Sequence, residues 1–373
     1  MASEKIAEIL DKAAEILLAH PLCDYCLGRQ FSALCYGAGN DEKGRAIKLL
    51  LTMRAVLKHK EEGEVDEVLK KIALTGFRPA IKTLQALGSE VPEPVECYIC
   101  GGALNKTRFR EIAEKAIEEL KEYEFRNFLV GARVPADVRE REDELRASFG
   151  IDTGEDIKSD ITREIGRIIQ RRFNVPVEYS SPEIVVLVDV FSGEYELQVN
   201  PLFIKGFYKK LAKNIPQTPW YCRYCWGRGC EKCNYTGKEY PDSVSELIGE
   251  PALKIFEALS YKFHGAGRED VDARMIGTGR PFILELKHPR KRFVDLSILE
   301  KAVNEHAAGK VEISGLSYSN RRELRLLKSL SPIASKTYEA VVEFDGEVNE
   351  EDLKTVEEKF RDCLLYTSPS PRD

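Results

Sequence analysis

Apolar residues recur at helical spacing through the first third of the chain. In residues 3–20 they fall on one stripe, which predicts an amphipathic helix. Similar stripes predict four more helices, at 41–59, 64–74, 79–87 and 106–123. Gly76 fits the end of one of these helices, and Pro92 and Pro94 indicate a loop. The N-terminal region is therefore expected to be helical.

The period of the pattern changes after Asn127. Continuous apolar runs at 128–131 and 184–188 predict buried strands, and the alternating run at 195–199 predicts a half-buried strand. A helical stripe at 157–173 lies between them. This part of the chain is expected to be an α+β unit.

A second mixed region follows an expected linker at 216–220. The pattern predicts strands near 282–286, 311–313 and 338–344, and helices near 244–263, 297–307 and 349–360. The last eleven residues, 363–373, resemble a translated sequencing adapter, so we expect them not to belong to the fold and the natural protein to continue differently. The predicted fold class is α+β with more than one domain.

Composition narrows the class of protein. The 373 residues contain no apolar run long enough for a membrane span and no signal peptide, which predicts a cytoplasmic protein. The net charge is −6, but RNA affinity depends on where positive charge lies. Basic residues gather at 205–213, 290–292 and 321–328. The basic and aromatic strip beginning at Lys205 is either an RNA-tracking surface or an ordinary surface helix.

Eight of the ten cysteines form Cys-x-x-Cys pairs, which in a chain without export signals favours metal over disulfides. Two pairs about seventy residues apart can supply four thiolates to one structural zinc, at Cys23, Cys26, Cys97 and Cys100. Two further pairs form a compact loop that could hold a second zinc, at Cys222, Cys225, Cys230 and Cys233. The alternative is a set of unrelated reduced thiols. Cys35 has no partner pair, and we interpret it as a buried thiol.

The segment 267–282 concentrates charge and glycine. Asp270 lies between Arg268 and Arg274, with Arg280 further along. Such a turn is either a solvated, salt-bridged loop or a carboxylate kept ionised as a nucleophile beside cations that hold phosphate. Asp272 is a rival carboxylate. The residue pattern alone leaves both interpretations open.

Two stretches carry a family resemblance. Gly-Arg-Glu-Asp at 267–270 and Gly-Thr-Gly-Arg-Pro-Phe at 277–282 resemble the archaeal and eukaryotic Pus-ten family of tRNA pseudouridine synthases. Lys336-Thr337-Tyr338 is similar to the second motif of that family. The resemblance implies Asp270 as the nucleophile and Tyr338 packed against the target base. It implies substrate binding by four cationic residues, Arg268, Arg274, Arg280 and Lys336.

The resemblance also implies a domain order. Residues 1–125 would form a helical region held together by zinc, and 126–215 an RNA-binding domain that resembles THUMP. Residues 216–362 would form an incomplete catalytic domain of the pseudouridine synthase type, a mixed, mainly antiparallel sheet with flanking helices. The third family motif would lie beyond the end of the sequence, so we expect the chain as given to be impaired or inactive.

The function implied is isomerisation of uridine to pseudouridine in the T-loop of tRNA, at tRNA positions 54 and 55, with structural zinc and no organic cofactor. The expected partner is tRNA, with no membrane and no evident obligate protein partner. The alternative is a non-catalytic tRNA-binding protein that uses the THUMP-like and zinc modules alone. A methyltransferase or thiolase would need a glycine-rich cofactor loop or P-loop-like motif, and the sequence has neither.

Overall fold

The computed structural model describes residues 2–330, 337–339 and 341–363. Residue contacts divide the chain into two units, Met1–Ser329 and Leu330–Asp373, and each is described by itself. Helices and two sheets share the first unit, so the predicted α+β fold class is confirmed. Among the described residues, every helix is too short or too polar to traverse a lipid bilayer.

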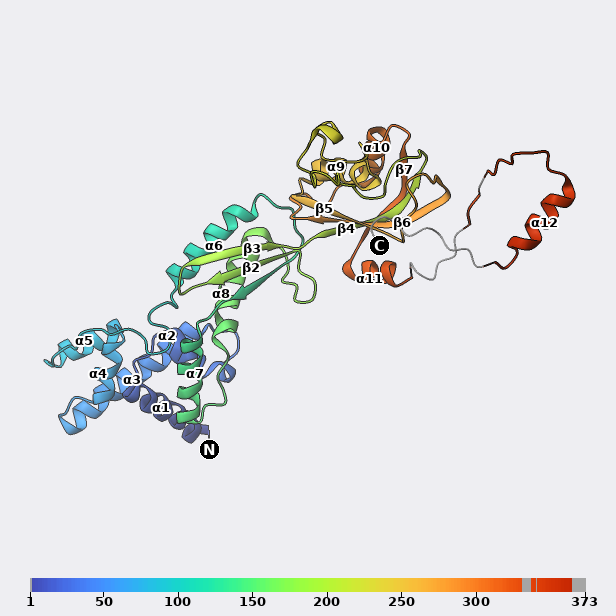
Figure 1. The fold of residues 1–373 in the computed structure, drawn as a ribbon. Coiled ribbons are helices and arrows are strands. Elements are labelled where there is room, and N and C mark those ends of the chain that lie inside the picture. Colours follow the sequence, from blue (N-terminus) through green and yellow to red (C-terminus); the bar gives the residue numbers. More distant parts are fainter. Residues whose placement is uncertain (1, 331–336, 340, 364–373) are drawn as a thin grey trace. The chain divides into compact units, whose positions relative to one another are not determined.

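The first unit begins with a cluster of helices (Figure 1). They are α1 (Ala2–Ala19), α2 (Asp24–Arg29), α3 (Asn40–Glu62), α4 (Glu67–Leu74) and α5 (Arg78–Ala86), with a short 3₁₀ turn at Ser32–Leu34. The side chain of Asp66 caps α4, and Gly63 ends α3 in the left-handed conformation. The sequence predicted four of these helices; α2 is too short to show a periodic pattern.

A three-stranded sheet follows, in the order β1-β2-β3. Its elements are α6 (Lys106–Leu120), β1 (Phe128–Ala132), α7 (Ala136–Phe149), α8 (Ile157–Phe173), β2 (Ile184–Asp189) and β3 (Glu194–Val199). β1 pairs with β2 in parallel and β3 pairs with β2 antiparallel. One apolar core runs from α1 into this sheet. We did not predict α7, because only Val138, Glu142 and Leu145 are buried on it and its remaining residues are mostly charged.

A four-stranded antiparallel sheet has the order β5-β6-β4-β7. Its elements are β4 (Leu202–Lys210), α9 (Val244–Phe256), β5 (Ser260–Gly265), β6 (Met275–Lys287), α10 (Leu296–His306), β7 (Val311–Ser319) and α11 (Arg321–Leu330). Ile204 and Leu284 face the core that contains α9 and α10. Their neighbours Phe203 and Ile283 pack with Leu324 of α11, because successive strand residues point to opposite faces. Helices therefore cover both faces (Figure 1).

Two placements differ from the expectation. The strip that begins at Lys205 was assigned to the THUMP-like region, but it is strand β4 and lies between β6 and β7 in the second sheet. The predicted helix 244–263 ends at Phe256, because Glu257 turns into the left-handed conformation and the chain reverses into β5. Local periodicity did not show either change, since both depend on pairing with distant strands.

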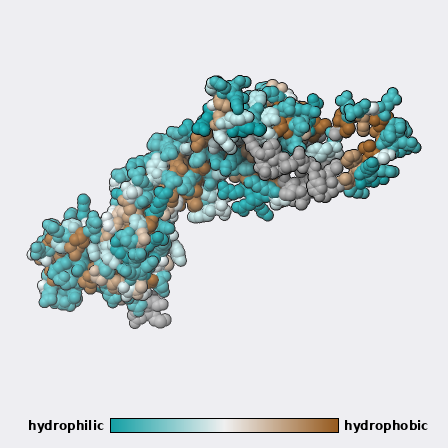
Figure 2. All heavy atoms as spheres, in the orientation of Figure 1, coloured by the Kyte–Doolittle hydropathy of each residue, from teal (hydrophilic) through white to brown (hydrophobic). Residues whose placement is uncertain are grey.

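Segments that flank the strands of the two sheets meet at Arg292, which is 3% exposed. Its backbone N–H donates to Glu124 (2.7 Å), and its guanidinium donates to the carbonyl oxygens of Glu183 (3.3 Å) and Asn200. Arg126 stacks over Phe293 at 4.0 Å. The face of the molecule in Figure 2 is mostly hydrophilic, with scattered hydrophobic residues. The buried apolar residues form separate cores around the two sheets.

The second unit contains α12 (Glu350–Phe360), which the sequence predicted. Asn349 caps this helix by accepting from the N–H of Asp352. The strand predicted at 338–344 is wrong for the described part of that segment, since 337–339 and 341–344 are not paired in any sheet. A strand forms only where another strand can pair with its backbone. Of the suspected adapter tail, 363–373, only Cys363 is described, and residues 364–373 lie outside the described residues, as does Lys336.

Candidate active site and metal centres

The loop 266–274 joins β5 to β6 and is held in place by buried side chains. Glu269 is its only deeply buried carboxylate, at 5% exposure. Its Oε2 accepts a hydrogen bond from the hydroxyl of Tyr208 (2.8 Å) and one from the amide of Gln217 (3.3 Å). Burial and the charge of Glu269 raise the pKa of Tyr208, so this phenol remains a donor. The Glu269 side chain therefore fixes the loop to the sheet.

Lys210 holds the backbone of the same loop. Its ammonium group is fully buried at the end of β4 and donates to three carbonyl oxygens, those of Asp270 (2.7 Å), Val271 (3.0 Å) and Ile215 (3.0 Å). Burial lowers the pKa of Lys210. Three acceptors match the three N–H bonds of an ammonium group, so these contacts offset the cost of burying it.

The Asp270 side chain is exposed while its backbone is fixed. Arg268, Asp272 and Arg274 are exposed on the same loop. Neither arginine forms an ion pair with Asp270 or with any other described carboxylate. Two carboxylates, those of Asp270 and Asp272, are therefore exposed to solvent beside two arginines that form no ion pair. Lys210 and Glu269 hold the backbone of this loop in place.

Arg280 lies differently from the other two arginines. It is 9% exposed, and its guanidinium is 3.4 Å from Oε2 of Glu269. Its Nε donates to the sulfur of Met275 at 3.2 Å. Gly279 comes just before it with φ +84°, and a Cβ there would lie 2.9 Å from the carbonyl oxygen of Tyr208. Arg280 is thus a buried partner of Glu269, and whether it also contacts substrate stays a prediction.

The two other predicted substrate residues fall in the second unit. Tyr338 is 70% exposed. Lys336 lies outside the part of the chain that is described. Their proximity to Asp270 stays a prediction.

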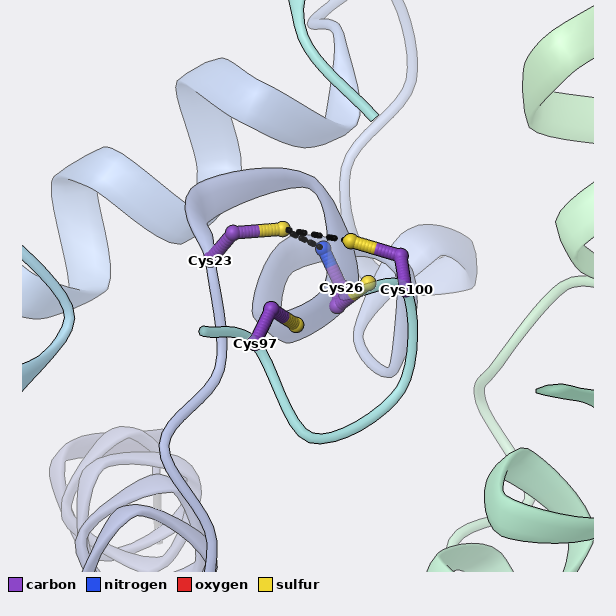
Figure 3. Close-up of side chains that lie close together, drawn as sticks. All are labelled: Cys23, Cys26, Cys97 and Cys100. Carbon is purple, nitrogen blue, oxygen red and sulfur yellow. Dashed lines mark hydrogen bonds between the residues drawn. The ribbon is translucent and has the colours of Figure 1, made fainter. Parts of the chain in front are cut away.

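Four cysteines predicted as ligands converge in the helical region: Cys23, Cys26, Cys97 and Cys100 (Figure 3). All four sulfur atoms lie within 4.8 Å of one another, and those of Cys23 and Cys100 are 3.7 Å apart. Zinc–sulfur bonds of about 2.3 Å in a tetrahedron give sulfur–sulfur edges of about 3.8 Å. Burial raises the pKa of the Cys26 thiol, so a thiolate there needs a cation beside it. The cluster fits a closed tetrahedral metal site.

The first cluster is also tied to the helices beside the sheet. Arg29, at the end of α2, is fully buried and donates to Glu142 of α7 at 2.6 Å. It also pairs with Asp160 of α8 at 3.5 Å and donates to the sulfur of Cys26 at 3.6 Å. The metal site and the sheet unit therefore share one buried charge network.

The second cluster lies in the loop between β4 and α9 and consists of Cys222, Cys225, Cys230 and Cys233. Its sulfur atoms also lie within 4.8 Å of one another, with neighbouring pairs at 3.7–3.9 Å. Backbone N–H groups of Gly229 and Gly237 donate to sulfur at 3.2 and 3.3 Å. Thiolates that accept such bonds are typical of metal knuckles. Cys35, predicted to be buried, is exposed, and the short turn before it, Ser32–Leu34, contains no buried residue.

Two family models match this chain. "Pus10, C-terminal" matches residues 203–369, and "Pus10 THUMP domain, archaeal" matches 112–189. Proteins named "tRNA pseudouridine synthase Pus10" are similar over most of its length. The one from Thermofilum pendens is 40% identical over 357 residues, which is 95% of this chain and 77% of the relative. The one from Methanopyrus kandleri is 41% identical over 352 residues, or 93% and 78%.

The chain belongs to the Pus10 family of tRNA pseudouridine synthases. The resemblance stated from the motifs is therefore confirmed. The match to the C-terminal Pus10 model begins at residue 203, inside β4, and includes both the Asp270 loop and the second cysteine cluster. The match to the THUMP model includes β1, α8 and the whole of β2. The finer domain boundaries given above stay predictions.

Sequence reasoning missed four residues that hold the loop 266–274 in place: Tyr208, Lys210, Gln217 and Glu269. Glu269 adjoins Asp270 in the motif, so its position was a usable signal. Tyr208 and Lys210 belong to the basic and aromatic strip noted in the sequence, but nothing local connected them to this loop. They lie about sixty residues away along the chain and meet the loop only through the pairing of β4 with β6.

A cavity of about 850 Å³ opens beside the first cysteine cluster, far along the chain from the Asp270 loop. Several cations line it: Arg45, Lys48, Arg78, Lys82 and Lys106. Lys48 pairs with Asp24 at 2.8 Å and Lys106 with Asp41 at 2.5 Å, so part of this charge is neutralised internally. The cavity contains none of the residues predicted to act on uridine.

Proposed function

We propose that this chain isomerises uridines 54 and 55 in the T-loop of tRNA, with Asp270 as the nucleophile. The observation that carries the proposal is the Asp270 loop of a Pus10 relative, whose backbone is fixed by Lys210 while its carboxylate is exposed. A carboxylate that must reach a nucleotide extruded from its stack needs both features. The family membership supports the reaction class.

The reaction exchanges one bond of the nucleotide for another. The bond from C1′ to N1 of uracil breaks and a bond from C1′ to C5 forms. C5 loses its hydrogen as a proton, and N1, which carries no hydrogen in uridine, gains a proton. Asp270 would attack either the sugar or the uracil ring and remain covalently bonded to the nucleotide while the base rotates. Arg268 and Arg274, exposed on the same loop, would neutralise flanking phosphates. Tyr338 would cover the base, and Lys336 would add a further cation.

Both cysteine clusters are proposed to hold structural zinc. Each has four thiolates and no histidine, which suits a closed site better than a catalytic one. The reaction itself needs no metal and no organic cofactor. The expected location is the cytoplasm, where tRNA is the partner.

The test is to map pseudouridine on a tRNA transcript after incubation with the chain. Tritium release from uridine labelled at C5 gives the amount, and chemical mapping gives the position. We expect pseudouridine at position 54, 55 or both. Binding of tRNA without release of tritium at any enzyme concentration would favour the non-catalytic tRNA-binding alternative.

Replacement of Lys210 by methionine is expected to slow the reaction without weakening tRNA binding. Methionine fills the same space but leaves the carbonyl oxygens of Asp270 and Val271 unpaired, at a cost of about 1–3 kcal/mol for each buried acceptor. We expect kcat to fall at least about tenfold, since that corresponds to about 1.4 kcal/mol of lost positioning. Steady-state kinetics and thermal unfolding measure the two effects.

A matched control is Lys209→Met, since Lys209 precedes Lys210 on β4 and pairs with Glu312 at 3.2 Å near the surface. That variant is expected to keep the kcat of the unmodified chain. Equal kcat values for Lys210→Met and Lys209→Met would show that the ammonium group does not position the loop.

A further inference from the structure

The second cysteine loop displays large aromatic side chains to solvent. Trp226 is 78% exposed, Tyr235 72%, Tyr224 63% and Tyr221 59%. All four lie within fifteen consecutive residues. Tryptophan is seldom left this exposed in a folded protein without a partner, because burying its ring stabilises the fold. These aromatic residues therefore indicate a binding surface.

The backbone of the loop turns these side chains outward and keeps them there. Its interior is occupied by the sulfur atoms and the N–H groups that donate to them. Trp226 has φ +52°, and Gly229 has φ +88° where a Cβ would lie 2.8 Å from the carbonyl oxygen of Tyr235. The loop is thus fixed by contacts between its two halves. A loop whose backbone is already held in one conformation loses less conformational entropy when it binds a ligand.

The charge of the loop is opposite to that of the whole chain. Between residues 221 and 238 there are four basic residues and one acidic residue, in a protein of net charge −6. The ammonium group of Lys232 lies 3.8 Å from the ring centroid of Tyr224. Arg228 is exposed and donates through Nε to the carbonyl oxygen of Cys225 at 3.3 Å. Arg223 pairs with Glu239 at 3.1 Å, so its charge is partly neutralised.

We propose that this loop is an RNA-stacking surface, on which Trp226 stacks with an unpaired base of the tRNA substrate while Lys232 and Arg228 contact phosphates. Exposed aromatics interleaved with cations are the chemistry by which proteins hold unpaired nucleotides, and small cysteine-zinc knuckles are one scaffold for it. A protein partner would match this positive charge less well than a polyanion. The inference rests on the proposed function, because it takes tRNA as the ligand.

The test measures the affinity of the metal-loaded full chain for a tRNA transcript. Trp226→Ala is expected to weaken binding about 5- to 100-fold, which is the usual worth of one base stacked on an aromatic ring. Trp226→Phe should retain most of the affinity, because its ring still stacks. Tyr36→Ala is the matched control, since Tyr36 is 91% exposed but lies on neither cysteine cluster. Equal zinc content in all variants shows that the loop remains folded.

The outcomes separate this inference from the proposed function, because affinity is read independently of turnover. If the unmodified chain forms pseudouridine and Trp226→Ala binds tRNA within twofold of it, the stacking surface is refuted and the enzyme assignment stands. Weaker binding in Trp226→Ala, restored in Trp226→Phe, supports the surface even if the unmodified chain forms no pseudouridine. Equal loss of affinity in Tyr36→Ala would also overturn it, since the effect would then not belong to this loop.

Discussion

Asp270→Asn is expected to abolish pseudouridine formation and to leave tRNA affinity and thermal stability nearly unchanged. The Asp270 carboxylate is exposed, and the contacts that fix the residue come from its backbone carbonyl oxygen. Asparagine keeps the shape of the side chain and that carbonyl but is not a nucleophile at oxygen. Loss of a covalent nucleophile lowers kcat on the order of 10³-fold or more. Tritium release measures kcat, and filter binding measures affinity.

The matched control is Asp272→Asn, because Asp272 is a second exposed carboxylate on the same loop. It removes the same charge and should lower the rate less than about tenfold. If Asp272→Asn loses most of its activity while Asp270→Asn remains active, Asp272 would be the nucleophile in place of Asp270. Activity retained in both variants would remove the carboxylate mechanism altogether.

The helices were the most predictable part of this fold, for a physical reason. A helix satisfies its own backbone, so a stripe of apolar residues such as that of α8 is enough to locate it. Strand β4 could not be assigned in the same way. Its place depends on β6 and β7, more than sixty residues away, and nothing local distinguishes a strand of one sheet from a strand of another. Helix α7 was missed because most of its residues are charged, so its sequence shows little hydrophobic periodicity.

Only those parts of the candidate site whose residues lie close together in the sequence could be predicted. Asp270 and its neighbouring arginines lie in one motif, and both cysteine sets have the spacing of metal knuckles. The charge partners predicted for Asp270 were not found among the described residues, where Arg268 and Arg274 are unpaired and Arg280 is turned inward to Glu269. Only the three-dimensional structure shows that the loop is fixed through Lys210 and Glu269, because those contacts join different strands.

Loss of the first cysteine site is expected to unfold the helical region. Cys97→Ser removes one thiolate from a cluster in which Cys26, Cys97 and Cys100 are all at most 8% exposed and belong to the main core. Structural zinc contributes about 10–16 kcal/mol in finger peptides, which is comparable to the stability of a whole protein, about 5–15 kcal/mol. Metal analysis should show one zinc fewer per chain. Amide hydrogen exchange should show lost protection in α1–α5.

The second cysteine site provides the contrast that makes this prediction specific. Cys233→Ser also removes one thiolate, but its cluster lies in a loop whose residues are largely exposed and are not part of the core beneath the four-stranded sheet. We expect it to lose one zinc and local protection at 221–238 while α1–α5 stay protected. Retained protection of α1–α5 in Cys97→Ser would show that the buried network of Arg29, Glu142 and Asp160 holds that region without metal.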